Sequence, residues 1–243
     1  KFIETNILGV VSLLKVSLDY FNKNTNFKFI QVSTDEVYGS LNSKSEPFTE
    51  SSPYFPNSPY SASKASSDHL VRAWFNTYNL PSIITNCTNN YGPYQFPEKL
   101  VPLTIVKCIN EKTIPVYGNG LNIRDWLHVE DHCSALNTVI EKGKVGEKYI
   151  IGGNNEIKNI DVVTKICSLM DEFLPRRNKK SYKDLIEYVD DRPGHDFRYA
   201  VNSAKIQQDL GWKQIQSFES GIINTTKWYL KNKEWLKNCS KNG

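Results

Sequence analysis

The amino-acid sequence predicts an α/β fold: a partial Rossmann-like, doubly wound parallel sheet followed by a smaller mixed α/β lobe at the C-terminus. Over about residues 1–112, short β-rich apolar runs alternate with helical patterns, which is typical of a parallel sheet covered on both faces. After residue 112 the strands become shorter and mix with helices. We therefore expect residues 1–112 to form half of a nucleotide-binding domain. Residues 113–243 would form mainly a substrate lobe, with possible crossings of the chain between the two.

The first half begins with a helix whose apolar residues lie on more than one face, which implies burial on more than one side. Ser58 and Pro59 supply an N-cap and a first-turn proline for a later helix. The predicted elements are a helix over 5–22, a strand over 27–32, a loop over 39–59, a helix to about 78, a strand over 82–87, a loop over 89–97 and a helix over 99–110.

The second half has weaker periodicity and shorter elements. Its predicted strands cover 114–117, 123–127, 148–151 and 186–189, and its helices cover 129–141, 159–173, 203–210 and 217–230. The last dozen residues are rich in Lys and Asn, and we expect them to fray.

Composition excludes several classes of function. The net charge is +4, and basic residues are interspersed with acidic ones, which argues against a nucleic-acid groove and suits a small anionic ligand. No apolar run approaches the roughly 18 residues of a membrane span. The five cysteines are odd in number, widely spread and never in a CxxC pair, so we expect reduced thiols in a cytoplasmic protein without a disulfide framework or zinc site.

The glycine-rich turn that opens a dinucleotide-binding fold does not occur in the sequence. Gly118-Asn119-Gly120 lacks the third glycine, because Ile123 stands in its place. The chain also begins within a helical pattern. We therefore expect a fragment that lacks its first half-sheet, on the order of 80–100 residues.

Tyr60 and Lys64 are four residues apart and lie one above the other on a helix face. A phenol is a poor base until a neighbouring cation favours its ionised form, and an ammonium one turn away can do this. The same spacing also occurs by chance on an ordinary helix surface. Ser33 and the strand that precedes it make a functional role for Tyr60 and Lys64 better supported.

Asp35 and Glu36 follow this strand directly. Two carboxylates in different environments can act as acid and base at one pH, as the removal of water from a sugar requires. Taken alone, the pair is more typical of a polar turn at the end of a strand than of an acid–base site.

Five motifs in this order closely resemble the dTDP-glucose 4,6-dehydratases, which are extended members of the short-chain dehydrogenase/reductase superfamily. The likeness runs from about residue 2 to the C-terminal helix. The motifs are Ser33-Thr34-Asp35-Glu36-Val37-Tyr38-Gly39, Tyr60-Ser61-Ala62-Ser63-Lys64, Asn89-Asn90-Tyr91-Gly92-Pro93 with Pro97-Glu98-Lys99-Leu100, the run from Ile123 to His132, and Asp191-Arg192-Pro193-Gly194-His195.

The resemblance implies an NAD-dependent hydro-lyase that converts dTDP-glucose to dTDP-4-keto-6-deoxyglucose and water. Tyr60 would take the proton of the 4-hydroxyl, Thr34 would hydrogen-bond that hydroxyl, and Lys64 would bind the nicotinamide ribose and lower the pKa of Tyr60. Glu36 would remove the C5 proton while Asp35 protonates the leaving 6-hydroxyl. Ser33, Tyr60, Lys64 and Asn90 would contact NAD.

The resemblance also implies a set of residues that hold the sugar nucleotide. Arg124 and Arg192 suit the diphosphate, because a guanidinium matches phosphate oxygens. The implied contacts are Thr34, Asn89, Glu98, Lys99, Leu100, Pro115, Tyr117, Arg124, Asn159, Arg192, His195 and Tyr199. The helices near 5–22 and 60–78 would form a homodimer interface.

Several alternatives stay open. A nucleotide-sugar 4-epimerase or a UDP-glucuronate decarboxylase would share Tyr60 and Lys64 but would not need Asp35. A UDP-glucose 4,6-dehydratase also stays possible, because the methyl group that distinguishes thymine from uracil leaves little trace in pocket residues. The missing glycine-rich segment allows an inactive binding or dimerisation module. Supply of L-rhamnose is only the commonest use of the reaction in the family. His128 and His132 have the spacing of a helical metal pair, but the sequence favours a capped helix start and no metal.

Overall fold

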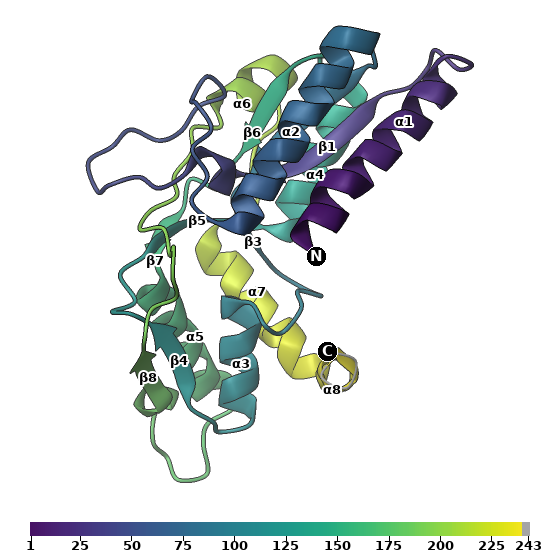
Figure 1. The fold of residues 1–243 in the computed structure, drawn as a ribbon. Coiled ribbons are helices and arrows are strands. Elements are labelled where there is room, and N and C mark those ends of the chain that lie inside the picture. The colour runs from purple at the N-terminus through teal and green to yellow at the C-terminus, as the bar shows by residue number, and fades with distance from the viewer. Residues whose placement is uncertain (240–243) are drawn as a thin grey trace.

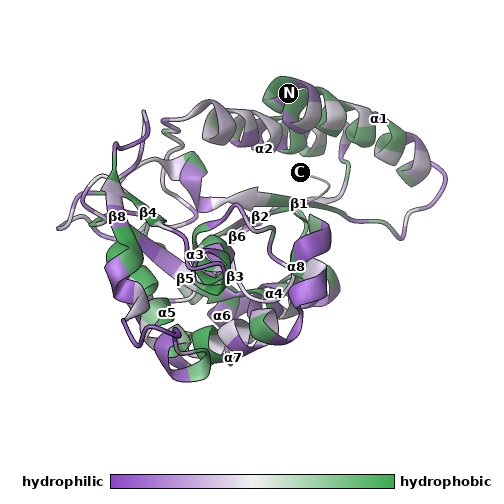
Figure 2. Ribbon diagram, turned by 90° about the horizontal axis from the view of Figure 1, so that it is seen from below, coloured by the Kyte–Doolittle hydropathy of each residue, from purple (hydrophilic) through white to green (hydrophobic). Residues whose placement is uncertain are grey.

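The computed structural model describes residues 1–239 and confirms the α/β class. Its main sheet has three parallel strands in the order β1–β2–β6, which are Phe29–Thr34, Ser82–Cys87 and Lys148–Ile151. Helices α1 (Gly9–Phe21) and α2 (Pro59–Tyr78) cover one face of this sheet. Helices α4 (Val129–Lys142) and α6 (Ala204–Leu210) cover the other face (Figure 2). The sheet is therefore doubly wound, as predicted.

Helix α2 begins where the sequence predicts. The Ser58 side chain accepts a hydrogen bond from the backbone N–H of Ser61, the Ser61 side chain accepts one from the backbone of Ser58, and Pro59 occupies the first turn. This capping box satisfies donors that would otherwise lack a partner at the helix start. It also fixes Tyr60 in the first turn of the helix.

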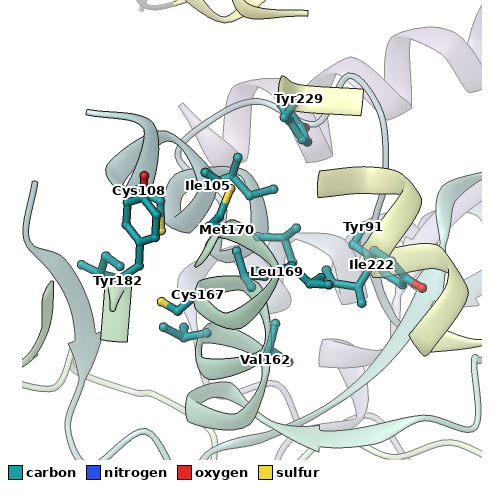
Figure 3. Close-up of a cluster of buried hydrophobic side chains, with 14 of the residues drawn as sticks. Tyr91, Ile105, Cys108, Val162, Cys167, Leu169, Met170, Tyr182, Ile222 and Tyr229 are labelled. Carbon is teal, nitrogen blue, oxygen red and sulfur yellow. The ribbon is translucent and has the colours of Figure 1, made fainter. Parts of the chain in front are cut away.

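A second group of elements packs around its own core, below the main sheet in Figure 1. Helices α3 (Leu100–Ile109), α5 (Asn159–Phe173) and α7 (Phe218–Lys231) surround buried side chains that include Ile105, Met170 and Tyr229 (Figure 3). Strand β4 (Ile114–Tyr117) pairs in parallel with β8 (Ile186–Val189). Strand β5 (Ile123–His128) lies between β3 (Asn89–Tyr91) and β7 (Glu156–Lys158).

Three expectations about elements are wrong. The predicted loop over 89–97 contains strand β3, and strand β7 was not predicted, because three-residue strands are too short to show periodicity. The predicted frayed end is helical in α8 (Lys233–Cys239), because Leu236 is buried against the second core. Residues 240–243 of that predicted end lie outside the described part of the chain.

The chain crosses between the two groups of elements more than once. Strand β6 comes after β4 and β5 in the sequence, yet it pairs with β2 in the main sheet. The loop between β1 and α2 is also tied to the C-terminal half, because Leu41 and Phe48 form isolated β-bridges with Arg198 and Val201. These crossings hold the ends of the main strands against the second core.

The first helical segment is covered on one side only within the chain. It comprises a π-helical turn, η1 (Ile3–Leu8), and α1. Leu14 is fully buried, but Leu8, Leu13 and Val16 are 57–67% exposed. The predicted burial on more than one side is therefore not provided by residues 1–239. No helix of this part of the chain is long and apolar enough to cross a bilayer.

Candidate active site

The two adjacent carboxylates lie at the carboxyl end of β1, in a short 3-10 helix, η2 (Asp35–Tyr38). Thr34 caps this turn: its Oγ1 accepts from the backbone N–H of Glu36 at 3.3 Å and donates to Asp35 Oδ1 at 3.3 Å. Asp35 is 1% exposed, and its Oδ2 has no hydrogen-bond partner within residues 1–239. One carboxyl oxygen is therefore held by Thr34 and the other is left without a protein partner.

The environments of the two carboxylates differ. Burial raises the pKa of Asp35 well above its usual range, and the charges of Glu36 and Asp125 raise it further. Burial also raises the pKa of Glu36, but the guanidinium groups of Arg124 and Arg192 oppose this shift. The surroundings thus favour the protonated form of Asp35 more strongly than that of Glu36.

Tyr60 and Lys64 lie on α2 beside this turn. Burial raises the pKa of Tyr60 to about 12, with further contributions from Glu36, Cys87 and Asp35, so the phenol lies near the carboxylates. The ammonium of Lys64 donates to the Val32 carbonyl at 2.7 Å, and burial lowers its pKa. The predicted lowering of the Tyr60 pKa by Lys64 is not found here, because the ammonium is held by the strand rather than by the phenol.

Ser33 in β1 and Asn90 in β3, both predicted to contact a cofactor, lie on either side of Cys87, the last residue of β2. Asn90 Nδ2 donates to Cys87 Sγ at 3.4 Å and to the Thr88 carbonyl at 3.1 Å. The Cys87 thiol donates to the Ser33 carbonyl at 3.5 Å. Asn90 Oδ1 is buried without a hydrogen-bond partner within the described chain, whereas the Ser33 hydroxyl lies close enough to Asp68 to lower the pKa of that carboxyl. The unpartnered buried oxygen of Asn90 fits a polar ligand at this position.

Arg124 is a buried guanidinium, only 4% exposed, that projects from β5. It donates to the carbonyls of Ile123, Phe197 and Asp196 at 2.8–3.3 Å, and it stacks 4.3 Å over the ring of Tyr199. Its charge reaches both Asp35 and Glu36. The structure thus brings predicted residues Arg124 and Tyr199 to the carboxylates.

Two further predicted regions approach the site from exposed loops. Glu98 and Lys99 form an ion pair at 2.9 Å at the start of α3, where Leu100 is the first residue, and the charge of Lys99 reaches Glu36. The charge of Arg192 also lowers the pKa of Glu36. His195 Nδ1 pairs with Asp191 Oδ1 at 2.6 Å.

The remaining predicted contacts lie at the ends of β3, β4 and α5. Asn89 and Asn159 each have a buried side-chain oxygen without a partner within residues 1–239. Pro115 and Tyr117 belong to β4. Among residues 1–239, no hydrogen bond or ion pair joins the side chains of Asn159, Pro115 or Tyr117 to the two carboxylates. The turn after β4 does reach the Asp191 loop, because a Cβ added at Gly118 would lie 3.0 Å from Asp191 Oδ2.

Several polar residues that support the site were not predicted. Asp196 accepts from Tyr199 Oη and from Asn57 Nδ2, and its carbonyl accepts from Arg124. Asp125 accepts from the backbone N–H groups of Gly153 and Asn155, and burial raises its pKa to about 6. Both aspartates are next to predicted site residues in the sequence. No sequence pattern indicates that their hydrogen bonds hold those residues in place.

The two histidines have different surroundings. His128 is the N-cap of α4, where its Nδ1 accepts from the backbone N–H of Glu130 at 3.4 Å, which confirms the capped helix start. His132 is buried, and its Nε2 has no partner within residues 1–239. This part of the chain contains no group of three or more His, Cys, Asp or Glu residues that could hold a metal.

A tyrosine and a lysine one helical turn apart, at the carboxyl edge of a doubly wound parallel sheet, define an extended short-chain dehydrogenase/reductase. A family model described as GDP-mannose 4,6 dehydratase matches residues 1–225. The dTDP-glucose 4,6-dehydratase of Salmonella typhimurium is 56% identical over 250 residues, which cover 98% of this chain and 69% of that protein.

Two solved structures are similar over 97% of the chain. The dTDP-glucose 4,6-dehydratase of Bacillus anthracis str. Ames in complex with NAD has 50% identity and a TM-score of 0.87, and 71% of that chain is covered. The dTDP-glucose 4,6-dehydratase of Streptomyces venezuelae with NAD and TYD bound has 41% identity and a TM-score of 0.88, and 69% of that chain is covered. The chain belongs to the family of dTDP-glucose 4,6-dehydratases.

Proposed function

We propose that the chain catalyses the NAD-dependent dehydration of dTDP-glucose to dTDP-4-keto-6-deoxyglucose. The observation that carries this proposal is the division between Asp35 and Glu36. Asp35 is buried with one oxygen unpartnered in the described chain, whereas Glu36 faces two guanidinium groups. A reaction that needs an acid and a base on one sugar requires such a pair, and an epimerase or a decarboxylase does not.

Ser33, Asn90, Tyr60 and Lys64 would hold the ribose and carboxamide of NAD at the nicotinamide end of a cofactor site. The unpartnered side-chain oxygen of Asn90 supports that role. When bound, NAD supplies the hydride acceptor for C4 and returns the hydride to C6.

The residues of the chain then move the protons. Thr34 hydrogen-bonds the 4-hydroxyl of the sugar, and Tyr60 accepts its proton. Because burial and nearby carboxylates raise the pKa of Tyr60, this step requires a positive charge beside the phenol. The Lys64 ammonium donates to the Val32 carbonyl in this structure, and we propose that it turns to the phenol when cofactor and substrate are bound.

The second pair of proton transfers removes water. The 4-keto group acidifies the proton on C5, and Glu36 accepts that proton. Asp35 Oδ2, which has no partner within residues 1–239, donates a proton to the leaving 6-hydroxyl. The roles of Asn89, Glu98, Lys99, Leu100, Pro115, Tyr117, Arg124, Asn159, Arg192, His195 and Tyr199 as sugar-nucleotide contacts belong to the same proposal.

We also propose how the chain is organised. Residues 1–112 would form the C-terminal half of an NAD-binding domain, and residues 113–243 mainly the sugar-nucleotide lobe. Exposed Leu8, Leu13 and Val16 support a homodimer through the first helical segment and α2. The five cysteines lie within residues 1–239 and are free, which supports a reducing compartment such as the cytoplasm.

The test is a product assay. Protein expressed from the complete gene is incubated with NAD and either dTDP-glucose or UDP-glucose, and the 4-keto-6-deoxy product is measured by its absorbance in alkali. We expect product from dTDP-glucose, and a loss of about 10³-fold or more for the Tyr60→Phe variant. Absence of product from the wild-type protein would overturn the proposal. Product from UDP-glucose alone would show that the substrate is the uridine nucleotide and not the thymidine nucleotide.

A further inference from the structure

A buried hydrogen-bonded network connects the two parts of the candidate site that lie on different elements. Its centre is Asp68, which is 1% exposed and lies on α2, one turn after Lys64 and two turns after Tyr60. The reaction described above does not use this carboxylate. A buried charged side chain in this place needs partners, because removal from water is costly without them.

The partners of Asp68 lead to the acid–base turn. Asp68 Oδ2 accepts from Tyr54 Oη at 2.9 Å and from Asn86 Nδ2 at 3.2 Å. Asn86 is fully buried in β2, and its Nδ2 also donates to the Thr34 carbonyl at 3.1 Å. Asn86 Oδ1 accepts from Tyr38 Oη at 3.3 Å. Asn86 therefore forms hydrogen bonds on both sides of the two carboxylates, to Thr34 before them and to Tyr38 after them.

Other buried bonds already hold α2 and β2 against β1. Gln31 Nε2 donates to Ser67 Oγ at 3.1 Å, and Thr85 Oγ1 donates to the Gln31 carbonyl at 3.3 Å. Neither bond reaches the turn after β1. The packing of helix on sheet thus has its own polar contacts, and the bonds of Asp68 and Asn86 add a connection specific to the turn.

We propose that Asp68 and Asn86 are positioning residues that hold the Thr34–Glu36 turn in fixed register with Tyr60 and Lys64. The proposal rests on the proposed function, in which one hexose must meet Tyr60 at C4 and the two carboxylates at C5 and C6. A small displacement between groups that act on the same substrate lowers the rate strongly while binding is little changed.

The main test is Asn86→Ala, compared with Ser67→Ala and Thr85→Val, which remove a buried hydrogen bond to Gln31 from α2 and from β2, respectively. We expect kcat of Asn86→Ala to fall about 100-fold, with KM for dTDP-glucose and the calorimetric affinity for dTDP within about threefold of wild type. The two controls should lose thermal stability to a similar extent and keep wild-type kcat.

Conservative variants separate positioning from general damage. In Asp68→Asn the amide oxygen can accept the same two bonds, so we expect kcat within about threefold of wild type, whereas Asp68→Ala should resemble Asn86→Ala. Tyr38→Phe keeps the buried ring and loses one bond, so it should fold normally and lose about fivefold in kcat.

The outcomes are distinct from those of the product assay. If wild-type protein makes no product, the proposed function fails. If wild type is active and both Asn86→Ala and Tyr38→Phe keep its kcat, the positioning role fails. The positioning role also fails if Ser67→Ala and Thr85→Val lose as much kcat as Asn86→Ala at equal loss of melting temperature, or if the loss appears in KM rather than kcat.

Discussion

At the scale of the residue, neighbours in sequence have different chemistry because the fold gives them different surroundings. Asp35 points into a buried space where Thr34 is its one hydrogen-bond partner within the described chain, while Glu36 lies where Arg124 and Arg192 oppose its protonation. The separation of their pKa values comes from burial and from unequal access to positive charge. We propose that this asymmetry lets Asp35 act as acid and Glu36 as base at one pH.

The Asp35→Asn substitution tests this division. We expect overall turnover to fall about 100-fold or more, because the leaving hydroxyl loses its proton donor. Exchange of the C5 proton with solvent deuterium, measured by mass spectrometry of recovered sugar nucleotide, should persist at a reduced level, because Glu36 remains. Asp209→Asn, an exposed carboxylate on α6, serves as the control. Normal turnover of the Asp35 variant would contradict the assignment.

At the scale of the element, α4 shows how a helix can carry two histidines with different roles. His128 caps the helix through its Nδ1. His132, one turn later, is buried without a partner for Nε2 within residues 1–239, and burial lowers its pKa from 6.5 to about 4. Protonation of His132 would leave a buried charge without compensation.

The stability of the protein should therefore depend on pH through His132. Its folded-state pKa is depressed, so between pH 6.5 and about 4 the unfolded state binds the proton first and stability falls as pH falls. We expect His132→Gln to gain about 2 to 3 kcal/mol in free energy of unfolding relative to wild type across this window. Urea unfolding at a series of pH values measures the difference.

The difference in free energy of unfolding between wild type and His132→Gln reports the titration of His132 alone. Asp125 titrates in the opposite sense: its folded-state pKa is raised from 3.8 to about 6, so its contribution is present at low pH and is lost as pH rises through that range. Because Asp125 is common to both proteins, its effect cancels. A difference in free energy that does not change with pH would show that His132 does not titrate as described.

At the scale of the whole molecule, two groups of elements are joined by a chain that crosses between them, and the candidate site draws residues from both. The main sheet supplies Thr34–Glu36 and α2 supplies Tyr60, whereas Arg124 and Tyr199 come from the second half of the sequence. The outer face of the first helical segment remains apolar and uncovered within residues 1–239. We expect a second copy of the chain to cover it.

The Leu13→Glu substitution tests the dimer. Leu13 is 60% exposed on α1, and burial of a leucine in an interface contributes about 1.5 to 3 kcal/mol. Replacing it with a charged side chain should weaken association by about 100-fold or more and shift sedimentation from dimer to monomer. Ile140→Glu, at an exposed apolar position on α4 across the sheet, should leave association unchanged. A monomeric wild type, or unchanged sedimentation of the Leu13 variant, would contradict the proposal.

Much of the fold could be predicted from local patterns. The strands over 82–87, 114–117 and 148–151 and the strand over 186–189 have the predicted bounds, because apolar and β-branched runs between turn residues are local signals. Ser58 and Pro59 predicted the start of α2 for a similar reason, since a cap is made by residues a few positions apart. The short strands β3 and β7 could not be predicted, because their pairing with β5 joins distant segments.

The sequence by itself determined the fold class, the order of the main elements and the residues whose side chains suit acid–base chemistry. Only the tertiary structure decided which buried polar residues support them. Asn86 is one of three polar residues in strand β2, and Asp196 follows the predicted residue His195, so no local pattern marks either of them as a support of the site. Their roles come from hydrogen bonds between residues 52 to 72 positions apart, such as Asn86 to Thr34 and Arg124 to Asp196, and such contacts exist only when the chain is folded.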